Sequence, residues 1–211
     1  MANPVNDTVP TYNAGEYITT TGMANRVARN ARVYGSSNIM MGGKCIIHTH
    51  AIIRGDLTRR EKAESETSAE KTRDIRSSSA PVAITCGRYC VFGDSCVVRP
   101  AYKVYKGLFS FYPVRMGHHV HIGAGSIVES AVIGDHVEIG RNCILGKLSV
   151  LKDSIRILDG AVVPPGTVLT SGTVWAGSPA KCIGDVAESF AEQHEIRSKD
   201  YYMRFKEAPR A

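Results

Sequence analysis

Histidine side chains are the first candidates for chemistry in this 211-residue sequence, because neutral imidazole binds zinc and exchanges protons near neutral pH. Two H-x-H pairs occur, His48/His50 and His119/His121. These pairs could form a surface metal site shared between two chains, but we expect them to be solvated surface histidines instead. No carboxylate lies at a spacing that singles out one histidine as a general base.

The six cysteines are the second set of candidates, as ligands of a metal or partners in disulfides. Cys86, Cys90 and Cys96 lie close together, and the other three are far away in the sequence. This arrangement lacks the paired short gaps of a structural zinc site. We therefore expect reduced cysteines that fill the core, with no bound metal and no cofactor.

A period of six residues defines the elements that must position these side chains. An apolar residue returns at every sixth position over 116–175, with one slip of a single residue. Two shorter runs, 41–53 and 86–98, carry the same period upstream. A period of six fits neither an α-helix nor a plain strand, so it indicates a repeat architecture in the form of a coil.

The same period assigns an orientation to the candidate residues. We expect the apolar residue that starts each repeat, and the residue two before it, to point inward. Glycine directly follows eight of the seventeen repeat starts, which suits a corner with a left-handed or cramped backbone. His119 and His121 flank the inward Val120, so they should point outward. Five cysteines fall on inward positions: Cys45, Cys86, Cys90, Cys96 and Cys143.

Hexapeptide repeats of this kind resemble the left-handed parallel β-helix, and the left hand is implied by that resemblance alone. Three repeats make one triangular turn, so seventeen faces predict an all-β fold of about five to six coils with a C-terminal α-helix. We expect an N-terminal arm at 1–22, the β-helix domain at 23–183 and a C-terminal helical segment at 184–211. Asp185 is expected to cap a helix over 188–206 that lies along the coil or covers its last turn.

Two segments interrupt the period and are the candidates for binding. Residues 58–81 are rich in Glu, Lys, Arg and Ser, which predicts a flexible charged insertion, solvated rather than docked. Residues 100–113 predict a projecting aromatic loop. Its rings either fold back on the coil or form a protein-binding patch, and the sequence favours neither. The candidate protein-binding residues are Tyr102, Lys103, Tyr105, Lys106, Phe109, Phe111 and Tyr112.

The charge pattern excludes other classes of partner. The net charge is +6, but acidic and basic residues are interspersed and no Lys/Arg run exceeds two residues. A nucleic-acid-binding protein would carry a concentrated basic stripe, so we expect no nucleic-acid partner. No apolar stretch approaches the roughly 20 residues that span a bilayer. We expect a soluble, cytoplasmic protein without direct membrane insertion.

One enzyme family with this architecture is the γ-class carbonic anhydrases. The segment IIRGDL resembles a corner of that family, with Arg54 and Asp56 matching, and we expect these two residues to form a local ion pair at a structural corner. The resemblance places the family's three zinc-binding histidines on Arg99, Ala124 and Glu129. These side chains cannot build a three-histidine site, so this activity is the least favoured.

A second enzyme family is the hexapeptide acyltransferases. The segment VWAGSPAK at 174–181 is similar to the ending of those enzymes, which non-enzymatic relatives share. Gly177 and Pro179 in it should stop the strand ladder. Acyl transfer from acetyl-CoA would need a histidine base near a coenzyme A site. This reading stays open as the alternative.

Longer segments resemble the dynactin subunit 5 family. They include GEYITTTGMANRVARNARVYGSSNIMMGGKCII at 15–47, VVRPAYKVYKGLFSFYPVRMGHHVHIG at 97–123 and ILDGAVVPPGTV at 157–168. The second segment carries the most specific motif and contains the aromatic loop. Membership would imply a non-catalytic subunit of the dynactin pointed-end complex, which supports cargo attachment to early endosomes in dynein-driven microtubule transport. The implied partners are a β-helical partner like dynactin subunit 6, actin-related protein 11, dynactin subunit 4 and dynein cargo adaptors.

Overall fold

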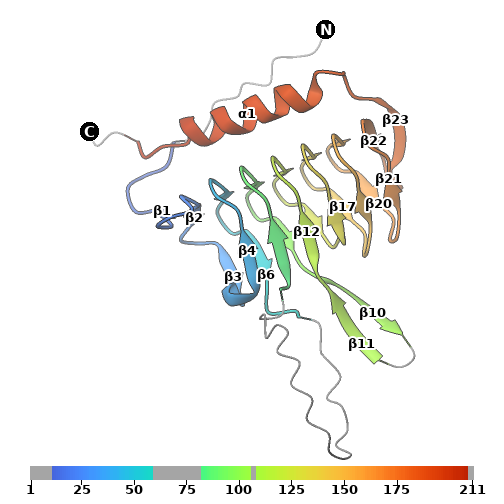
Figure 1. The fold of residues 1–211 in the computed structure, drawn as a ribbon, viewed down its shortest axis with the longest axis horizontal. Coiled ribbons are helices and arrows are strands. Elements are labelled where there is room, and N and C mark those ends of the chain that lie inside the picture. Colours follow the sequence, from blue (N-terminus) through green and yellow to red (C-terminus); the bar gives the residue numbers. More distant parts are fainter. Residues whose placement is uncertain (1–10, 59–81, 106–107, 209–211) are drawn as a thin grey trace, which may run out of the picture.

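The computed structural model describes residues 11–58, 82–105 and 108–208. Most of the predicted charged insertion (59–81), Lys106 and the first ten residues of the predicted arm lie outside the described residues. The chain folds into a parallel β-helix with three sheets, and one helix lies along its side (Figure 1). Within the described residues, no helix is both long enough and apolar enough to span a membrane.

Each coil contributes one short strand to each of three parallel sheets. Sheet 1 contains β2 (Arg26–Ala28), β5 (Ile46–Ile47), β8 (Val91–Phe92), β13 (His121–Ile122), β16 (Glu138–Ile139), β19 (Arg156–Ile157) and β22 (Thr173–Ala176). Sheet 2 contains β3 (Arg32–Tyr34), β6 (Ile52–Arg54), β9 (Val97–Val98), β14 (Ile127–Val128), β17 (Ile144–Leu145) and β20 (Val162–Val163). Sheet 3 contains β4 (Ile39–Met41), β7 (Ile84–Cys86), β12 (Val114–Met116), β15 (Val132–Ile133), β18 (Val150–Leu151) and β21 (Val168–Leu169).

The coil is slightly longer than the six-residue period indicated. Strands β2 and β3 add two faces before the first predicted one, so the described residues hold six complete coils and β22 begins a seventh. Register is kept from coil to coil, with Ile122 opposite Ile139 and Ile139 opposite Ile157. A short 3-10 helix, Ser36–Asn38, lies between β3 and β4.

The interior is built from the repeat starts, as the period predicted. All of them are buried except Met41 and Trp175, which are partly buried near the two ends of the stack. Burial of one Ile or Leu side chain contributes about 1.5–3 kcal/mol, so the stacked rows supply most of the stabilising energy. The five cysteines assigned to inward positions are buried, and all six are free thiols.

The glycines that follow the repeat starts are required by crowding rather than by a left-handed backbone. A Cβ on Gly123 would lie 2.3 Å from the carbonyl oxygen of Gly140 on the next coil. Gly123 is not among the positive-φ residues. The left-handed corners lie elsewhere, for example at His119 (φ 56°) and His136 (φ 55°).

Both ends of the sheet 1 ladder carry an antiparallel strand. β1 (Tyr17–Thr19) pairs with β2, although the aperiodic arm predicted no strand there. β23 (Lys181–Asp185) folds back on β22, so the parallel ladder ends where the motif VWAGSPAK predicted. The pairing of β23 with β22 contains a register shift, and such irregularities limit further strand addition at an edge.

Helix α1 (Phe190–Arg204) begins after Ser189, and the prediction that Asp185 caps it is wrong. Asp185 pairs with Thr173 at the end of β23, which keeps its backbone extended. The helix runs back along the coil, the first of the two positions expected (Figure 1). Arg26 donates hydrogen bonds to the carbonyls of Tyr202 and Phe205, where the C-terminal end of a helix favours a cation.

The predicted aromatic loop is an antiparallel hairpin, β10 (Ala101–Tyr105) and β11 (Leu108–Tyr112). It projects from the side of the stack opposite α1 (Figure 1). It leaves the coil between β9 and β12, at a corner between sheets 2 and 3. Residues 59–81 fall between β6 and β7, so both interruptions leave from the same corner of successive coils.

Candidate functional site

The hairpin holds part of the predicted binding residues on the surface. Tyr102 stacks on Phe109 with ring centroids 5.3 Å apart, and Phe109 meets Phe111 edge-on at 4.9 Å. Tyr102 is 44% exposed and Phe109 47% exposed, so these two rings lie on the surface of the protein. Lys103 is exposed as well. Pairing the rings with each other keeps an aromatic surface rigid, which suits a contact patch.

The other predicted members differ in their surroundings. Phe111 and Tyr112 are partly buried near the base of the hairpin. The side chain of Tyr105 and all of Lys106 lie outside the described residues. Lys147, which the sequence did not single out, places its ammonium 3.7 Å from the ring centroid of Tyr102. This cation–π contact fixes the hairpin to a later coil.

Arg54 and Asp56 form the corner ion pair that the sequence predicted. The Arg54 Nε and Nη2 atoms each lie 2.7 Å from a carboxylate oxygen of Asp56. The hydrogen bond from Arg54 lowers the pKa of the Asp56 carboxyl. Both side chains are more than one third exposed, so the pair stabilises the corner by less than about 1 kcal/mol. Asp56 also lines a cavity of about 330 Å³ together with Phe109 and Phe111 of the hairpin.

The outer face of sheet 2 carries a row of aliphatic side chains that the sequence analysis missed. Successive strands pair in register, so the residues just before the inward ones form one row across the sheet. We call this row the apolar stripe: Ile52, Val97, Ile127, Ile144 and Val162. Ile144 is 43% exposed, and the other four are partly buried. The sequence signal that could have revealed this row is the apolar residue that directly precedes each repeat start of sheet 2 from β6 onward.

The other two outer faces differ from sheet 2. The corresponding row on sheet 3 is interrupted by Thr85 and Arg115. Sheet 1 is covered by α1 over its first coils, where Ile46 packs with Tyr202 and Phe205. Sheet 3 also carries three adjacent aliphatic side chains, Val132, Val150 and Val168, so the apolar stripe, with five members, is the longest uncovered aliphatic row of the described coil.

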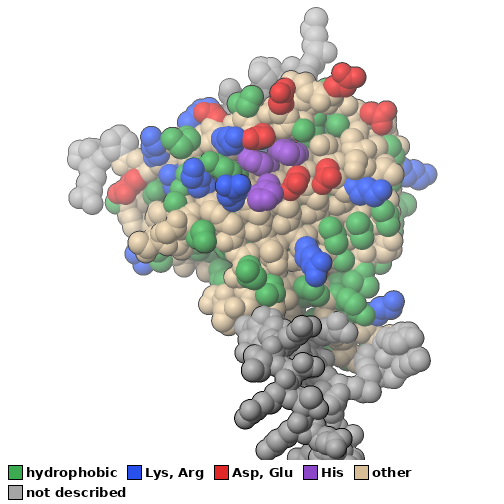
Figure 2. Space-filling model, in the orientation of Figure 1, with side chains coloured by type: hydrophobic (Ala, Val, Ile, Leu, Met, Phe, Trp, Pro, Cys, Tyr) green, Lys and Arg blue, Asp and Glu red, His purple; other side chains and the backbone are tan. Residues whose placement is uncertain are grey.

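The expectation of solvated histidines is wrong for His48 and His119, because α1 covers them. Tyr17 and Tyr201 hydrogen-bond the two ring nitrogens of His48, at 3.1 and 2.9 Å. Burial lowers the pKa of His48 to about 4. His50 and His121 are exposed, as expected. Figure 2 shows histidines gathered among basic and acidic side chains on one face.

His119 and His136 lie with Glu195 of α1 in a compact group. Their ligand atoms lie within 4.8 Å of one another, and the two imidazole rings stack with centroids 5.3 Å apart. His119 Nδ1 is occupied by a hydrogen bond to Ser198, and His136 Nε2 lies 3.8 Å from the Glu195 carboxylate. These contacts attach α1 to the coil, which accounts for the burial of His119.

The positions matched to the carbonic anhydrase ligands hold an ion pair. Arg99 Nε lies 2.7 Å from Oε1 of Glu129, and the two residues follow the paired strands β9 and β14. Ala124, the third position, has no donor atom in its side chain. A cation and a carboxylate that neutralise each other do not form a zinc site.

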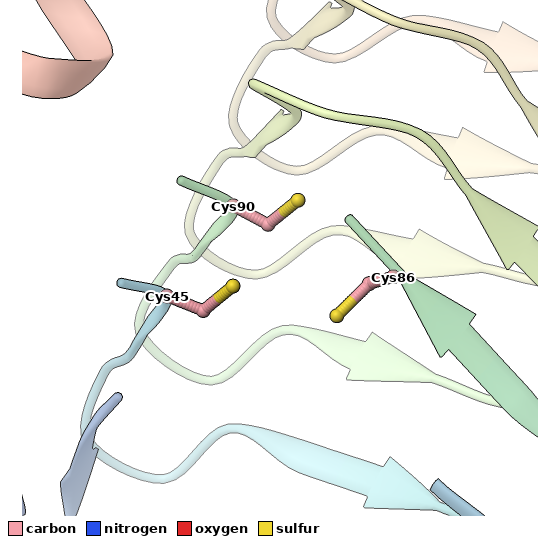
Figure 3. Close-up of side chains that lie close together, drawn as sticks. All are labelled: Cys45, Cys86 and Cys90. Atoms are coloured by element: carbon pink, nitrogen blue, oxygen red, sulfur yellow. The ribbon is translucent and has the colours of Figure 1, made fainter. Parts of the chain in front are cut away.

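Three cysteines that are separated in the sequence meet inside the coil. The sulfur atoms of Cys45, Cys86 and Cys90 lie within 4.8 Å of one another (Figure 3). Sequence spacing alone did not group Cys45 with the others. Hydrogen bonds from Cys86 and Cys90 lower the pKa of the Cys45 thiol, and hydrogen bonds with Cys45 and Cys86 raise the pKa of the Cys90 thiol.

The comparisons with known sequences group this chain with one family. The family model described as dynactin subunit 5 matches residues 64–209. Dynactin subunit 5 of Dictyostelium discoideum is 30% identical over 123 residues, 58% of this chain and 50% of that protein. An uncharacterized protein of the same organism is 30% identical over 162 residues, 77% of this chain and 62% of that protein. The chain thus spans between half and two thirds of the length of these relatives.

Enzymes also appear among the similar proteins. A 2,3,4,5-tetrahydropyridine-2,6-dicarboxylate N-acetyltransferase of Staphylococcus aureus is 32% identical over 87 residues, 38% of this chain and 36% of that enzyme. A hexapeptide transferase family protein from Anaplasma phagocytophilum has a similar structure, with a TM-score of 0.56, 19% identity and coverage of 87% and 92% of the two chains. AntD, an N-acyltransferase from Bacillus cereus solved with dTDP and 3-hydroxybutyryl-CoA, gives a TM-score of 0.57, 14% identity and coverage of 83% and 87%. These structures share the fold and confirm the left-handed parallel β-helix.

Proposed function

The chain belongs to the dynactin subunit 5 family, and from this we propose that it is a non-catalytic structural subunit of dynactin. Its place would be the pointed-end complex, in the cytoplasm and on microtubules. There it would support the attachment of cargo adaptors and early endosomes for dynein-driven transport. The proposed partners are a β-helical subunit like dynactin subunit 6, actin-related protein 11 and dynactin subunit 4.

The observation that carries this proposal is the apolar stripe on sheet 2. Aliphatic side chains on an exposed flat sheet gain free energy when a partner removes them from water, about 25 cal/mol for each Å² of apolar surface. A second β-helix presents a flat face of the same kind and matches the spacing of the strands. The stripe therefore supports side-by-side pairing with a β-helical subunit.

The hairpin offers a second contact next to the stripe. Its exposed rings, Tyr102 and Phe109, lie beyond the corner at which sheet 2 ends. Aromatic side chains dominate the energetics of many protein interfaces, because they bury a large area with few rotatable bonds. We assign this patch to a second partner, a cargo adaptor or another pointed-end subunit.

Two of the seven histidines, His48 and His119, are unavailable as a catalytic base, which agrees with a non-catalytic role. An acyltransferase needs a histidine base that reaches its substrate. His119 is buried under α1 and hydrogen-bonded to Ser198, and His48 is held between two tyrosines. The acyltransferase alternative rests on the 87 residues shared with the N-acetyltransferase and on the common fold.

A pulldown with matched variants tests the pairing surface. Ile144→Glu places a charge in the apolar stripe on β17. Val132→Glu makes the same change at the matching position of sheet 3, where Val132 is 39% exposed against 43% for Ile144. From cell extract, the Ile144 variant should lose dynactin components and the Val132 variant should retain them, with similar melting temperatures. Equal recovery of dynactin by both variants would contradict the assignment of the stripe.

A further inference from the structure

Three cysteines from two successive coils converge on one point of the interior (Figure 3). Cys45 and Cys90 take the same inward position, just before β5 and β8 of sheet 1. Cys86 is the last residue of β7, on sheet 3. Cys45 is 0% exposed, Cys90 1% and Cys86 4%, so solvent hardly reaches the sulfur atoms.

Core filling alone does not account for three thiols at one level of the coil. Cys96 and Cys143 occupy inward positions elsewhere, and each belongs to no such group among the described residues. They show what a single cysteine does as a space-filling residue. The equivalent positions on later coils hold Val, Ile and Thr in sheet 1 and Met, Ile and Leu in sheet 3. Cys45, Cys86 and Cys90 differ from these because their donor atoms all face one another.

The geometry of the group matches a small thiophilic cation. Sulfur atoms no more than 4.8 Å apart all lie within about 2.8 Å of a common centre, and a Zn²⁺–S bond is about 2.3 Å long. Each sulfur would move inward by about half an ångström, which a change of side-chain torsion supplies. We propose that Cys45, Cys86 and Cys90 form a binding site for Zn²⁺.

Charge and coordination number decide in favour of zinc. Three Zn–S bonds replace three S–H bonds, and the released protons pass to solvent, so the site carries a net charge of −1. A monovalent cation such as Cu⁺ on three thiolates would leave −2 in an apolar interior, which costs more. Zn²⁺ takes four ligands, and we assign the fourth position to one of the backbone carbonyls that accept hydrogen bonds from these thiols. The carbonyl oxygens of Gly87 and Gly117 lie 3.3 Å from Cys45 Sγ and 3.2 Å from Cys90 Sγ.

The site would cross-link the parts of the coil that lie before and after residues 59–81. Cys45 precedes residues 59–81 and Cys86 follows them, while both strands belong to the second coil. A bound ion would connect a residue before residues 59–81, a residue after them and Cys90 of the third coil. This role adds a metal to the scaffold and does not depend on which partner the scaffold binds.

Metal analysis of the refolded full chain tests the proposal. The reduced chain is refolded with one equivalent of Zn²⁺, separated from free metal by gel filtration and analysed by mass spectrometry. We expect about one zinc per chain, lost in Cys86→Ser and in the double variant Cys45→Ala/Cys90→Ala. Cys96→Ala and Cys143→Ala are the matched controls and should retain it.

Cobalt substitution provides a second measurement that reports thiolate ligands directly. Refolding with Co²⁺ should give a sulfur-to-metal charge-transfer band in the near ultraviolet, and Cys86→Ser should abolish the band while circular dichroism shows the same fold. If the wild-type chain retains neither ion after refolding, the proposal is wrong. It is equally wrong if the double variant folds and retains as much zinc as wild type.

Discussion

His119 Nδ1 lies 2.6 Å from the Ser198 hydroxyl. This hydrogen bond joins the corner between β12 and β13 to α1. The Ser198 hydroxyl donates to the carbonyl of Glu195, so His119 must be the donor and carries its proton on Nδ1. The pair is buried, with His119 8% exposed. Burial under the helix lowers the pKa of His119, so the docked helix favours its neutral form.

Acid should weaken the attachment of α1. Burial lowers the pKa of His48 to about 4 and that of His194 to about 3, and it also lowers the pKa of His119. Asp94 opposes the shift at His48, and His121 adds to it. Unfolded histidine has a pKa near 6.5, so the unfolded chain binds more protons between about pH 6.5 and 4. The free energy of unfolding should thus fall as the pH falls through this range.

Thermal unfolding followed by circular dichroism between pH 7.5 and 4.5 measures this effect. In a chain of this size, Tm should fall by about 2–4 °C for each kcal/mol lost. The variant His48→Gln should show a shallower dependence on pH, and His50→Gln, at an exposed position, should keep the wild-type slope. Identical slopes in all three proteins would rule out the role assigned to His48.

Two adjacent residues of β17 should respond very differently to truncation. Leu145 is fully buried, whereas Ile144 is 43% exposed. Leu145→Ala leaves a cavity in the coil and should cost about 2–5 kcal/mol. Ile144→Ala should change stability by no more than about 0.5 kcal/mol, because the lost surface faces solvent. Urea unfolding of the isolated chain compares the two, and similar losses would mean that the apolar stripe is a structural surface.

Removal of the exposed hairpin rings should weaken binding without affecting the fold. The double variant Tyr102→Ser/Phe109→Ser deletes the stacked ring pair of the hairpin, and the hairpin projects from the coil (Figure 1). We expect at least a tenfold weaker pulldown of the partner that contacts the hairpin, and a Tm within about 2 °C of wild type. A large drop in Tm would instead assign the rings to the core.

Coenzyme A binding separates a scaffold from an acyltransferase. A ligand at one hundred times its Kd stabilises the folded state by about 2.7 kcal/mol. With His119 and His48 held under α1, we expect no shift of Tm with acetyl-CoA up to millimolar concentrations. A saturable rise in Tm at micromolar acetyl-CoA would favour the acyltransferase alternative, and acyl transfer lost on substitution of an exposed histidine, such as His121→Gln, would establish it.

Much of the coil could be predicted from sequence because its period is local. Each hexad fixes by itself which side chain points inward, so Leu145 and Cys143 are recognisable as interior without knowledge of the other coils. The interruptions could be located for the same reason, since the hairpin breaks the count. Its strand pairing was less visible, because five-residue strands rich in aromatics and lysine also fit a projecting loop.

The sequence by itself determined the coil, its interior and its corners, including the Arg54–Asp56 pair. Only the tertiary structure decided which outer face is covered. That outcome depends on where α1 packs, and α1 lies about 70 residues after His119 and about 140 after His48. The meeting of Cys45 with Cys90 has the same cause, since residues one coil apart become neighbours only when the insertion between them is spanned. A local period specifies inside and outside, whereas contacts between distant segments select the surface that remains for partners.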